Sequence, residues 1–410
     1  MKKVAVLTTS RADFGLQRDF IASLVALKTY EVDVVVSGSH FLDQSGESLR
    51  EVRENLAGIG ARQVAMPVPN AGSEGKSQRG HLLTRSDTLA SMMDQAGSYL
   101  EASRPDAVVF LGDRWELWGF VYPAYLAGIP LFHLSGGETT AGALDDSIRH
   151  ALTKLSSIHL VAAEPYGRVV SQMGEEDWRI SVCGEPGLDR LSQLEPRSKT
   201  AFCATLGLDG AKPLILLALH PATLESDTTL IDNLKALSHT VHALSGFSFV
   251  MTAPGSEPGS EIIENWGRAE MSGNENFVYV DSLGRDRFIE AISHSSLMVG
   301  NSSSGIVEAP TIGTRTLNLG SRQSGRLKAD SVKDLEFECG ALVEEIKRQT
   351  ALPDEGRGSF ANPYDPFGDG QNTARAVKSL SFALNQYSPE LLIKKKLVFD
   401  VRPRDWMSFL

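Results

Sequence analysis

Short apolar runs alternate with segments of helical periodicity along most of the chain. The runs are three to eight residues long, which suits strands buried on both faces of a sheet. The segments between them repeat their apolar residues every three or four positions, most clearly in Asp87–Ala102 and Trp115–Ala127. Such alternation is typical of α/β proteins with parallel sheets. The pattern predicts strands at Val4–Thr8, Glu31–Val36, Ala107–Leu111, Leu131–His133, His159–Ala162, Arg179–Val182, Pro213–His220, Ser248–Thr252, Phe277–Val280, Leu297–Gly300 and Thr314–Leu317.

A polar stretch near the middle of the chain, Leu188–Lys199, predicts a crossing between two domains. The length of 410 residues also exceeds that of one typical domain. We expect two doubly wound, Rossmann-like α/β domains at residues 1–188 and 189–380, and a tail at 381–410 for which the sequence indicates no role. Two such sheets that face each other across a cleft bind ligands at the carboxyl ends of their strands. This is the glycosyltransferase-B arrangement.

Composition and charge narrow the classes of function. Hydrophobic residues make up 42% of the chain, enough for full cores, but no apolar run is long enough to span a bilayer. The formal net charge of −11 argues against nucleic acid as a partner. The three cysteines are widely spaced and form no metal pattern, and no G-x-G-x-x-G motif follows the first strand. We therefore expect a cytoplasmic protein with no metal or other cofactor, no membrane and no nucleic-acid partner.

The segment Val299–Arg326, VGNSSSGIVEAPTIGTRTLNLGSRQSGR, carries the strongest functional signal. A predicted strand ends at Gly300, and a helix is expected to begin near Ser303. The hydroxyls of Ser302 and Ser303 and the backbone N–H groups around them would then lie at a helix N-terminus, a place suited to phosphate. An ordinary serine cap would also explain these serines taken alone.

Polar residues further along the same segment fit the rest of a nucleotide. Glu308 lies one turn beyond the serines, where its carboxylate could accept hydrogen bonds from two vicinal ribose hydroxyls. Arg322, Gln323 and Arg326 follow a second short strand and could close over a base or a pyrophosphate. The combination indicates a nucleotide diphosphate site.

Two motifs follow predicted strands in the first half of the chain. Arg11, in the sequence SRADFG after the first strand, could reach a phosphate across the cleft, or could be a solvated charge beside a serine cap. Asp113, in LGDRWE after the strand at 107–111, occupies a position typical of a catalytic carboxylate, with Arg114 beside it. The alternative for Asp113 is a cap of the following helix.

The densest group of titratable residues lies in HLSGGE, residues 133–138, and LDDSIRH, residues 144–150. The two glycines permit a tight turn with its backbone close to a ligand. Glu138, Asp145 and Asp146, with an arginine and a histidine on the same helix, resemble an acid/base assembly, although one aspartate is expected to cap the helix. His220, directly after a strand, could donate to a phosphate or be a buried structural histidine.

These motifs together resemble the hydrolysing branch of the UDP-N-acetylglucosamine 2-epimerases, the bacterial sialic-acid-pathway type. The resemblance runs from about Val4 to about Leu380, and DDSIRHALTK at 145–154 is its best discriminator for that branch. It implies catalytic roles for Asp113 and Asp145, and Glu138 is the third catalytic candidate because it belongs to the acid/base group described above. It further implies that substrate or UDP contacts come from Arg11, Arg114, His220, Leu283, Phe288, Ser302, Ser303, Glu308 and Arg322, with Leu283 and Phe288 lining the uracil pocket.

The resemblance also implies a reaction. UDP would leave UDP-N-acetylglucosamine by elimination through a 2-acetamidoglucal, and rehydration would give free N-acetylmannosamine for sialic-acid-type biosynthesis. Many relatives carry a glutamate where this chain has Ser135, and several carry one where it has Ala222. The order of action of the carboxylates therefore stays open. A homo-oligomer, dimer or tetramer, is expected.

Three alternatives remain at this stage. The same reaction could act on a UDP-diacetamido-dideoxy sugar of the legionaminic acid type. A glycosyltransferase-B transferase would share the nucleotide site and the fold. A sensor would bind the UDP-sugar without turnover.

Overall fold

The computed structural model describes residues 1–394 apart from 42–46, 69–77, 142, 194, 223, 256–258, 355 and 357. Over these residues the chain forms two wholly parallel sheets, one of seven strands and one of six. The first sheet has the order β3 (Arg62–Ala65), β2 (Tyr30–Val36), β1 (Lys2–Thr8), β4 (Ala107–Leu111), β5 (Leu131–Leu134), β6 (Ile158–Val161), β7 (Ile180–Val182). The second has the order β10 (Phe277–Val280), β9 (Ser248–Thr252), β8 (Leu214–Ala218), β11 (Leu297–Gly300), β12 (Thr316–Leu319), β13 (Val332–Leu335).

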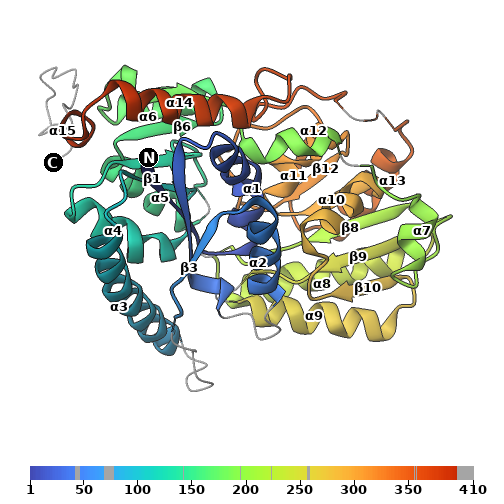
Figure 1. Ribbon diagram of the computed structural model, residues 1–410. Coiled ribbons are helices and arrows are strands. Elements are labelled where there is room, and N and C mark those ends of the chain that lie inside the picture. Colours follow the sequence, from blue (N-terminus) through green and yellow to red (C-terminus); the bar gives the residue numbers. More distant parts are fainter. Residues whose placement is uncertain are drawn as a thin grey trace, which may run out of the picture.

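Both sheets are doubly wound, with helices on both faces, and the two lobes lie side by side (Figure 1). The central strands are apolar throughout because both of their faces are covered, and Val4, Val6 and Leu217 are almost fully buried. The predicted pair of Rossmann-like domains in a glycosyltransferase-B arrangement is confirmed. The helices are α1 (Arg11–Ala26), α2 (Glu47–Ile59), α3 (Gln78–Ser103), α4 (Trp118–Leu126), α5 (Asp145–Leu155), α6 (Glu164–Gln172), α7 (Lys199–Ala204), α8 (Asp227–Ala243), α9 (Ser260–Gly273), α10 (Gly284–His294), α11 (Ser304–Val307), α12 (Ala309–Ile312), α13 (Cys339–Thr350), α14 (Asn372–Gln386) and α15 (Pro389–Ile393).

The C-terminal helix α14 returns to the first lobe. Its apolar residues Ala376, Leu380 and Ala383 belong to the same buried cluster as Phe20 and Leu24 of α1. Figure 1 shows α14 lying along the top of that lobe, near β6 and α6. The expected boundary at residue 380 falls inside this helix, and residues 395–410 of the expected tail lie outside the described residues.

Two buried polar side chains fix this returning segment. Asp189 accepts the backbone N–H groups of Asn372 at 3.0 Å and Thr373 at 2.7 Å, so its carboxylate caps the positive end of α14. Arg179 donates to the carbonyl oxygens of Leu391 and Leu392 at 3.0 and 2.9 Å and so satisfies the end of α15. The segment 372–393 is therefore part of the first lobe.

The structure corrects several predicted elements. Two edge strands, β3 and β13, were not predicted. The strand expected at Thr314–Leu317 lies two residues later, at 316–319. The helix expected near Ser303 has only four residues, after which α12 begins with Pro310 in its first turn. In the part of the chain that the structure describes, no helix combines the length and apolar character needed to cross a bilayer.

Candidate active site

Loops at the carboxyl ends of the two sheets meet between the lobes. The loop after β5 and the loop after β12 join through a backbone hydrogen bond from Ala141 N–H to the carbonyl of Ser324, 2.9 Å long. A methyl group on Gly325 would approach Thr139 Cγ2 to 2.9 Å, so the two backbones are in close contact. From the start of α1, Arg11 Nη1 donates to Ser282 Oγ at 2.9 Å, which joins the first lobe to the loop before α10. The expected convergence of strand-end motifs from both halves is therefore observed.

Arg149 of α5 is the centre of the acidic part of the site. Its guanidinium is almost fully buried and forms an ion pair with Asp113, at the end of β4. It also donates to the carbonyl oxygen of Glu138 at 2.9 Å and to the Thr140 hydroxyl at 3.1 Å. Burial and the nearby Arg326 charge lower the pKa of Arg149 to about 9, so the group stays cationic at neutral pH. One buried cation thus holds the Asp113 loop and the Glu138 loop together.

The two aspartates at the start of α5 differ from expectation. The cap position of the helix is Leu144, so neither aspartate side chain caps it. Asp146 instead accepts the backbone N–H of Thr140 at 2.5 Å and lies 3.8 Å from Arg149. Asp145 is half-buried in the first turn of the helix. Asp113 is likewise no cap, because the short helical turn that follows it is preceded by Arg114.

Glu138 lies in the loop after β5 and pairs with an arginine of the other lobe. Its Oε2 lies 2.9 Å from Nη1 of Arg326, and both side chains are largely buried. Burial raises the pKa of Glu138, whereas the charge of Arg326 opposes that shift. Arg326 was expected near a base or a pyrophosphate, but its guanidinium is engaged with this carboxylate. The ion pair connects the two sheets at the acidic cluster.

The glycines before Glu138 are required by the protein's own packing. A methyl group on Gly136 would lie 2.9 Å from Nδ1 of His133, and one on Gly137 would lie 2.5 Å from the carbonyl of Tyr166. Gly137 also has a φ of +78°, which favours glycine. The predicted tight turn is confirmed, and the atoms close to it are those of β5 and α6. His133 is structural: it bonds to the Gly112 carbonyl, and burial lowers its pKa to about 3.

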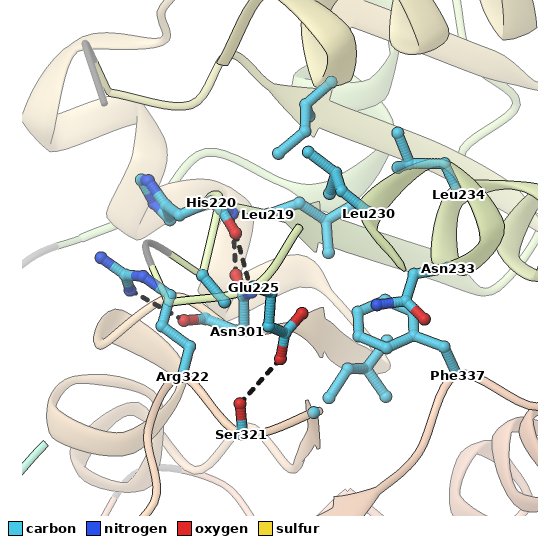
Figure 2. Close-up of a pocket in the computed structure, with 14 residues that line it drawn as sticks. Leu219, His220, Glu225, Leu230, Asn233, Leu234, Asn301, Ser321, Arg322 and Phe337 are labelled. Carbon is cyan, nitrogen blue, oxygen red and sulfur yellow. Dashed lines mark hydrogen bonds between the residues drawn. The ribbon is translucent and has the colours of Figure 1, made fainter. Parts of the chain in front are cut away.

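Asn301, directly after β11, organises the second half of the site. Its side chain exchanges two hydrogen bonds with the backbone of His220, with lengths of 2.7 and 2.8 Å. Its carbonyl oxygen accepts from Arg322 at 3.0 Å and from Gln323 at 2.9 Å. Figure 2 shows His220 above Asn301 and Arg322 to its left, with the hydrogen bond between Ser321 and Glu225 below them. Two motifs separated by about a hundred residues are thus held at one point.

The serines and Glu308 lie on the segments that follow Asn301. Ser302 is buried and Ser303 half-buried, at the first turn of α11. Glu308, between α11 and α12, is buried and forms an ion pair with Arg285 of α10. Arg285 already binds this carboxylate. A ribose at Glu308 would therefore have to share the carboxylate with Arg285 or displace the guanidinium.

The other residues predicted to contact the substrate lie on nearby loops and helices, but their side chains do not meet at one point. Arg114 pairs with Glu116 at 2.7 Å. Leu283 is buried and Phe288 half-buried, both in the apolar cluster beneath α10 and α11. His220 accepts the Gly255 N–H through Nδ1 at 3.3 Å, so it has a structural contact besides its place beside Asn301. Within the described ranges, no group of three or more His, Cys, Asp or Glu side chains is placed to hold a metal ion.

Sequence reasoning missed three residues of this site. Asn301 follows a strand, and so does Glu185, which accepts a hydrogen bond of 2.5 Å from Ser135 in the turn before Glu138, so a search of every strand end for polar residues would have found both. Arg285 carries no such signal, because it lies inside a helix and only its contact with Glu308 places it in the site.

Comparison with known proteins gives the family of the chain. The family model described as UDP-N-acetylglucosamine 2-epimerase matches residues 23–381. A UDP-N,N'-diacetylbacillosamine 2-epimerase (hydrolyzing) from Legionella pneumophila is 29% identical over 381 residues, covering 93% of this chain and 96% of the relative. A GDP/UDP-N,N'-diacetylbacillosamine 2-epimerase (hydrolyzing) from Campylobacter jejuni is 30% identical over 346 residues, covering 82% and 85%.

Among solved structures, the UDP-GlcNAc 2-epimerase from Neisseria meningitidis bound to UDP-GlcNAc has a TM-score of 0.72. The match covers 94% of this chain and all of that chain at 16% identity, which shows a shared fold. The family model matches most of the sequence, and this match shows the family of the chain. The chain belongs to the UDP-N-acetylglucosamine 2-epimerase family.

Proposed function

We propose that the protein is a hydrolysing 2-epimerase of UDP-2-acetamido sugars, which releases UDP and the free sugar with inverted configuration at C2. The observation that carries the proposal is the Arg149 cluster, which brings Asp113 and the Glu138 loop to one buried cation. Carboxylates beside arginines at the edge of a cleft suit proton transfer at a sugar carbon. The segment from Asn301 to Arg322 supplies the proposed binding site for the UDP part of the substrate.

The reaction proceeds in two stages. In the first, a carboxylate takes the C2 proton while the bond between C1 and the UDP oxygen breaks, leaving a 2-acetamidoglucal. Arg11, His220 and the serines at the start of α11 stabilise the negative charge that UDP gains. In the second, an acid returns a proton to C2 on the opposite face, and water adds to C1. One proton is released to solvent overall, and Asp113, Asp145 and Glu138 are the groups proposed for these transfers.

The identity of the sugar is the finer part of the proposal. The names of two relatives that are 29% and 30% identical favour a diacetamido sugar, UDP-N,N'-diacetylbacillosamine. UDP-N-acetylglucosamine is the second candidate, since the fold is shared with an enzyme bound to that substrate. Both carry the 2-acetamido group and the C2 proton that the proposed chemistry needs.

A UDP-release assay with each sugar tests this function. We expect UDP and a free sugar of inverted C2 configuration from one or both substrates, without added metal, cofactor or acceptor. Release that depends on an acceptor would instead indicate a transferase. Binding of both UDP-sugars without release would indicate a sensor.

A further inference from the structure

A buried glutamate outside the predicted site lies against the turn that carries Glu138. Glu185 follows β7 in the sequence Gly-Glu-Pro and is 3% exposed. Its backbone N–H donates to the Tyr364 carbonyl at 2.8 Å, which fixes the main chain. Its Oε2 accepts a hydrogen bond of 2.5 Å from Ser135 Oγ. Its Oε1 is buried and has no hydrogen-bond partner among the described residues.

Ser135 links Glu185 to the acidic cluster. It directly follows β5 and has a φ of +59°, a left-handed conformation that is unfavourable for a non-glycine residue. Its backbone N–H donates to the Leu160 carbonyl at 3.0 Å, and its hydroxyl is held by Glu185. Three residues further on, Glu138 pairs with Arg326. The hydrogen bond from Ser135 to Glu185 therefore fixes one end of the turn and the ion pair fixes the other.

The charged groups that face Glu185 come from three loops. Glu138, after β5, and Glu308, after α11, disfavour a second negative charge, whereas Arg326, after β12, favours it. Burial is the largest influence on the pKa of Glu185, and the hydrogen bond from Ser135 opposes it; the net effect raises the pKa to about 8. The carboxyl is thus neutral at pH 7. If it ionised, its Oε1 would be a buried charged oxygen without a donor among the described residues, and the carboxylate would repel Glu138.

We propose that Glu185 is a positioning residue for the epimerase reaction: in its neutral form it holds Ser135 and the turn that presents Glu138, and its ionisation sets the alkaline limit of activity. The inference rests on the proposed function.

The variant Glu185→Gln tests this directly, because the amide keeps the size and the acceptor oxygen but cannot ionise. At pH 7 it should retain at least about a third of the wild-type kcat. The wild-type kcat should fall as the pH rises through about 8, and in the variant this fall should move upward by at least about one pH unit. If kcat fell at the same alkaline pH in the variant as in the wild type, the proposal would be overturned. Loss of activity at every pH would also overturn it, because Glu185 would then be needed for its proton.

The chain offers a matched control in a second glutamate that accepts from a serine. Glu270 of α9 is buried and bonds to the hydroxyl of Ser238, away from the acidic cluster. In Glu270→Gln, kcat should fall at the same alkaline pH as in the wild type. If the pH at which kcat falls moved equally in both variants, the shift would be a general effect of removing a buried carboxyl. That result would contradict a specific role for Glu185.

Thermal unfolding gives a readout that does not require turnover. Glu185 has a pKa of about 8 in the folded protein against an ordinary value of 4.5. Between these values the folded state holds a proton that the unfolded chain has released, so the stability it confers decreases as the pH rises. The Tm of Glu185→Gln relative to wild type should therefore rise from about pH 5 to about pH 8 and then level off. A flat difference would overturn the proposal. If the Tm difference between the variant and the wild type follows this profile but the wild-type protein turns over no UDP-sugar, the proposed function is refuted instead.

Discussion

At the scale of single residues, the candidate site depends on a few buried cations that each hold several acceptors. Arg149 joins the Asp113 and Glu138 loops, and Arg326 joins Glu138 to the other lobe. The side-chain amide of Asn301 binds the backbone of His220, and the main-chain carbonyl of Asn301 accepts from Arg322. Asp113 and Glu138 are thus each held in place by a buried arginine.

The variant Asp113→Asn separates chemistry from nucleotide binding. If Asp113 acts on the sugar, kcat should fall by about 10²- to 10⁴-fold, the usual cost of losing a general acid or base. The affinity for UDP should stay within about threefold of wild type, because most of the proposed nucleotide contacts lie in the other lobe. A UDP-release assay and calorimetric titration measure the two quantities. UDP affinity that falls in step with turnover would mean that Asp113 orders the phosphate site instead.

The variant Glu308→Gln tests the ribose contact. Losing charge-assisted hydrogen bonds worth roughly 1.5–3 kcal/mol should weaken UDP binding by roughly 10- to 150-fold. Inhibition by pyrophosphate, which has no ribose, serves as the control and should change little. If pyrophosphate and UDP weakened equally, the loss would come from the freed Arg285, which pairs with Glu308 in this structure.

The sequence identified most of the candidate residues but not their partners. Most of the predicted side chains were found by their place after a strand, a rule that holds for any doubly wound sheet, whereas Leu283 and Phe288 were expected only from the family resemblance. The contact between Asn301 and His220 joins residues 81 positions apart, and no local pattern records such a pairing. Glu185 also follows a strand, but only the fold shows that Ser135, Glu138 and Arg326 lie around it.

At the scale of secondary structure, close approach of elements determines where glycine is needed. The turn after β5 packs against α6 so tightly that Gly137 has no room for a side chain. In α5, on the other side of the turn, Arg149 binds the carbonyl oxygen of Glu138. The position of Glu138 is therefore set by β5, α5 and α6 together.

The variant Gly137→Ala tests this packing, with Gly60→Ala as its control. Both residues have nearly the same φ, +78° and +77°, but a methyl group at Gly60 would meet nothing within 4 Å. Gly137→Ala should cost about 1–3 kcal/mol more than Gly60→Ala because of overpacking. Thermal unfolding of the two variants gives the comparison. Equal shifts in Tm would mean that α6 yields to the added methyl group.

The hydrophobic pattern predicted the central strands and the edge strands β7 and β10, but it missed the other two edge strands. The strands β1, β4 and β8 are apolar runs because both faces are covered. The edge strands β3 and β13, with the sequences RQVA and VKDL, are exposed and carry charges, so they lack that pattern. The periodicity of α14 shows that one of its faces is buried, but it cannot show that the face belongs to the first lobe.

At the scale of the whole molecule, the two lobes are joined by contacts at the site itself. The pairs Glu138–Arg326 and Arg11–Ser282 cross between the lobes where the reaction is proposed to occur. The chain crosses a second time when α14 returns to the first lobe. The expected dimer or tetramer remains a prediction, to be checked by light scattering.

The central claim is that UDP leaves by elimination and that solvent then supplies the C2 proton. The most direct measurement is proton NMR of the sugar released in deuterated water, with UDP-N,N'-diacetylbacillosamine and UDP-N-acetylglucosamine run in parallel. The account predicts a free sugar of inverted C2 configuration that carries deuterium at C2. A released sugar that keeps its C2 proton and its original configuration would contradict the account, because it would show that only the bond to UDP had been cleaved.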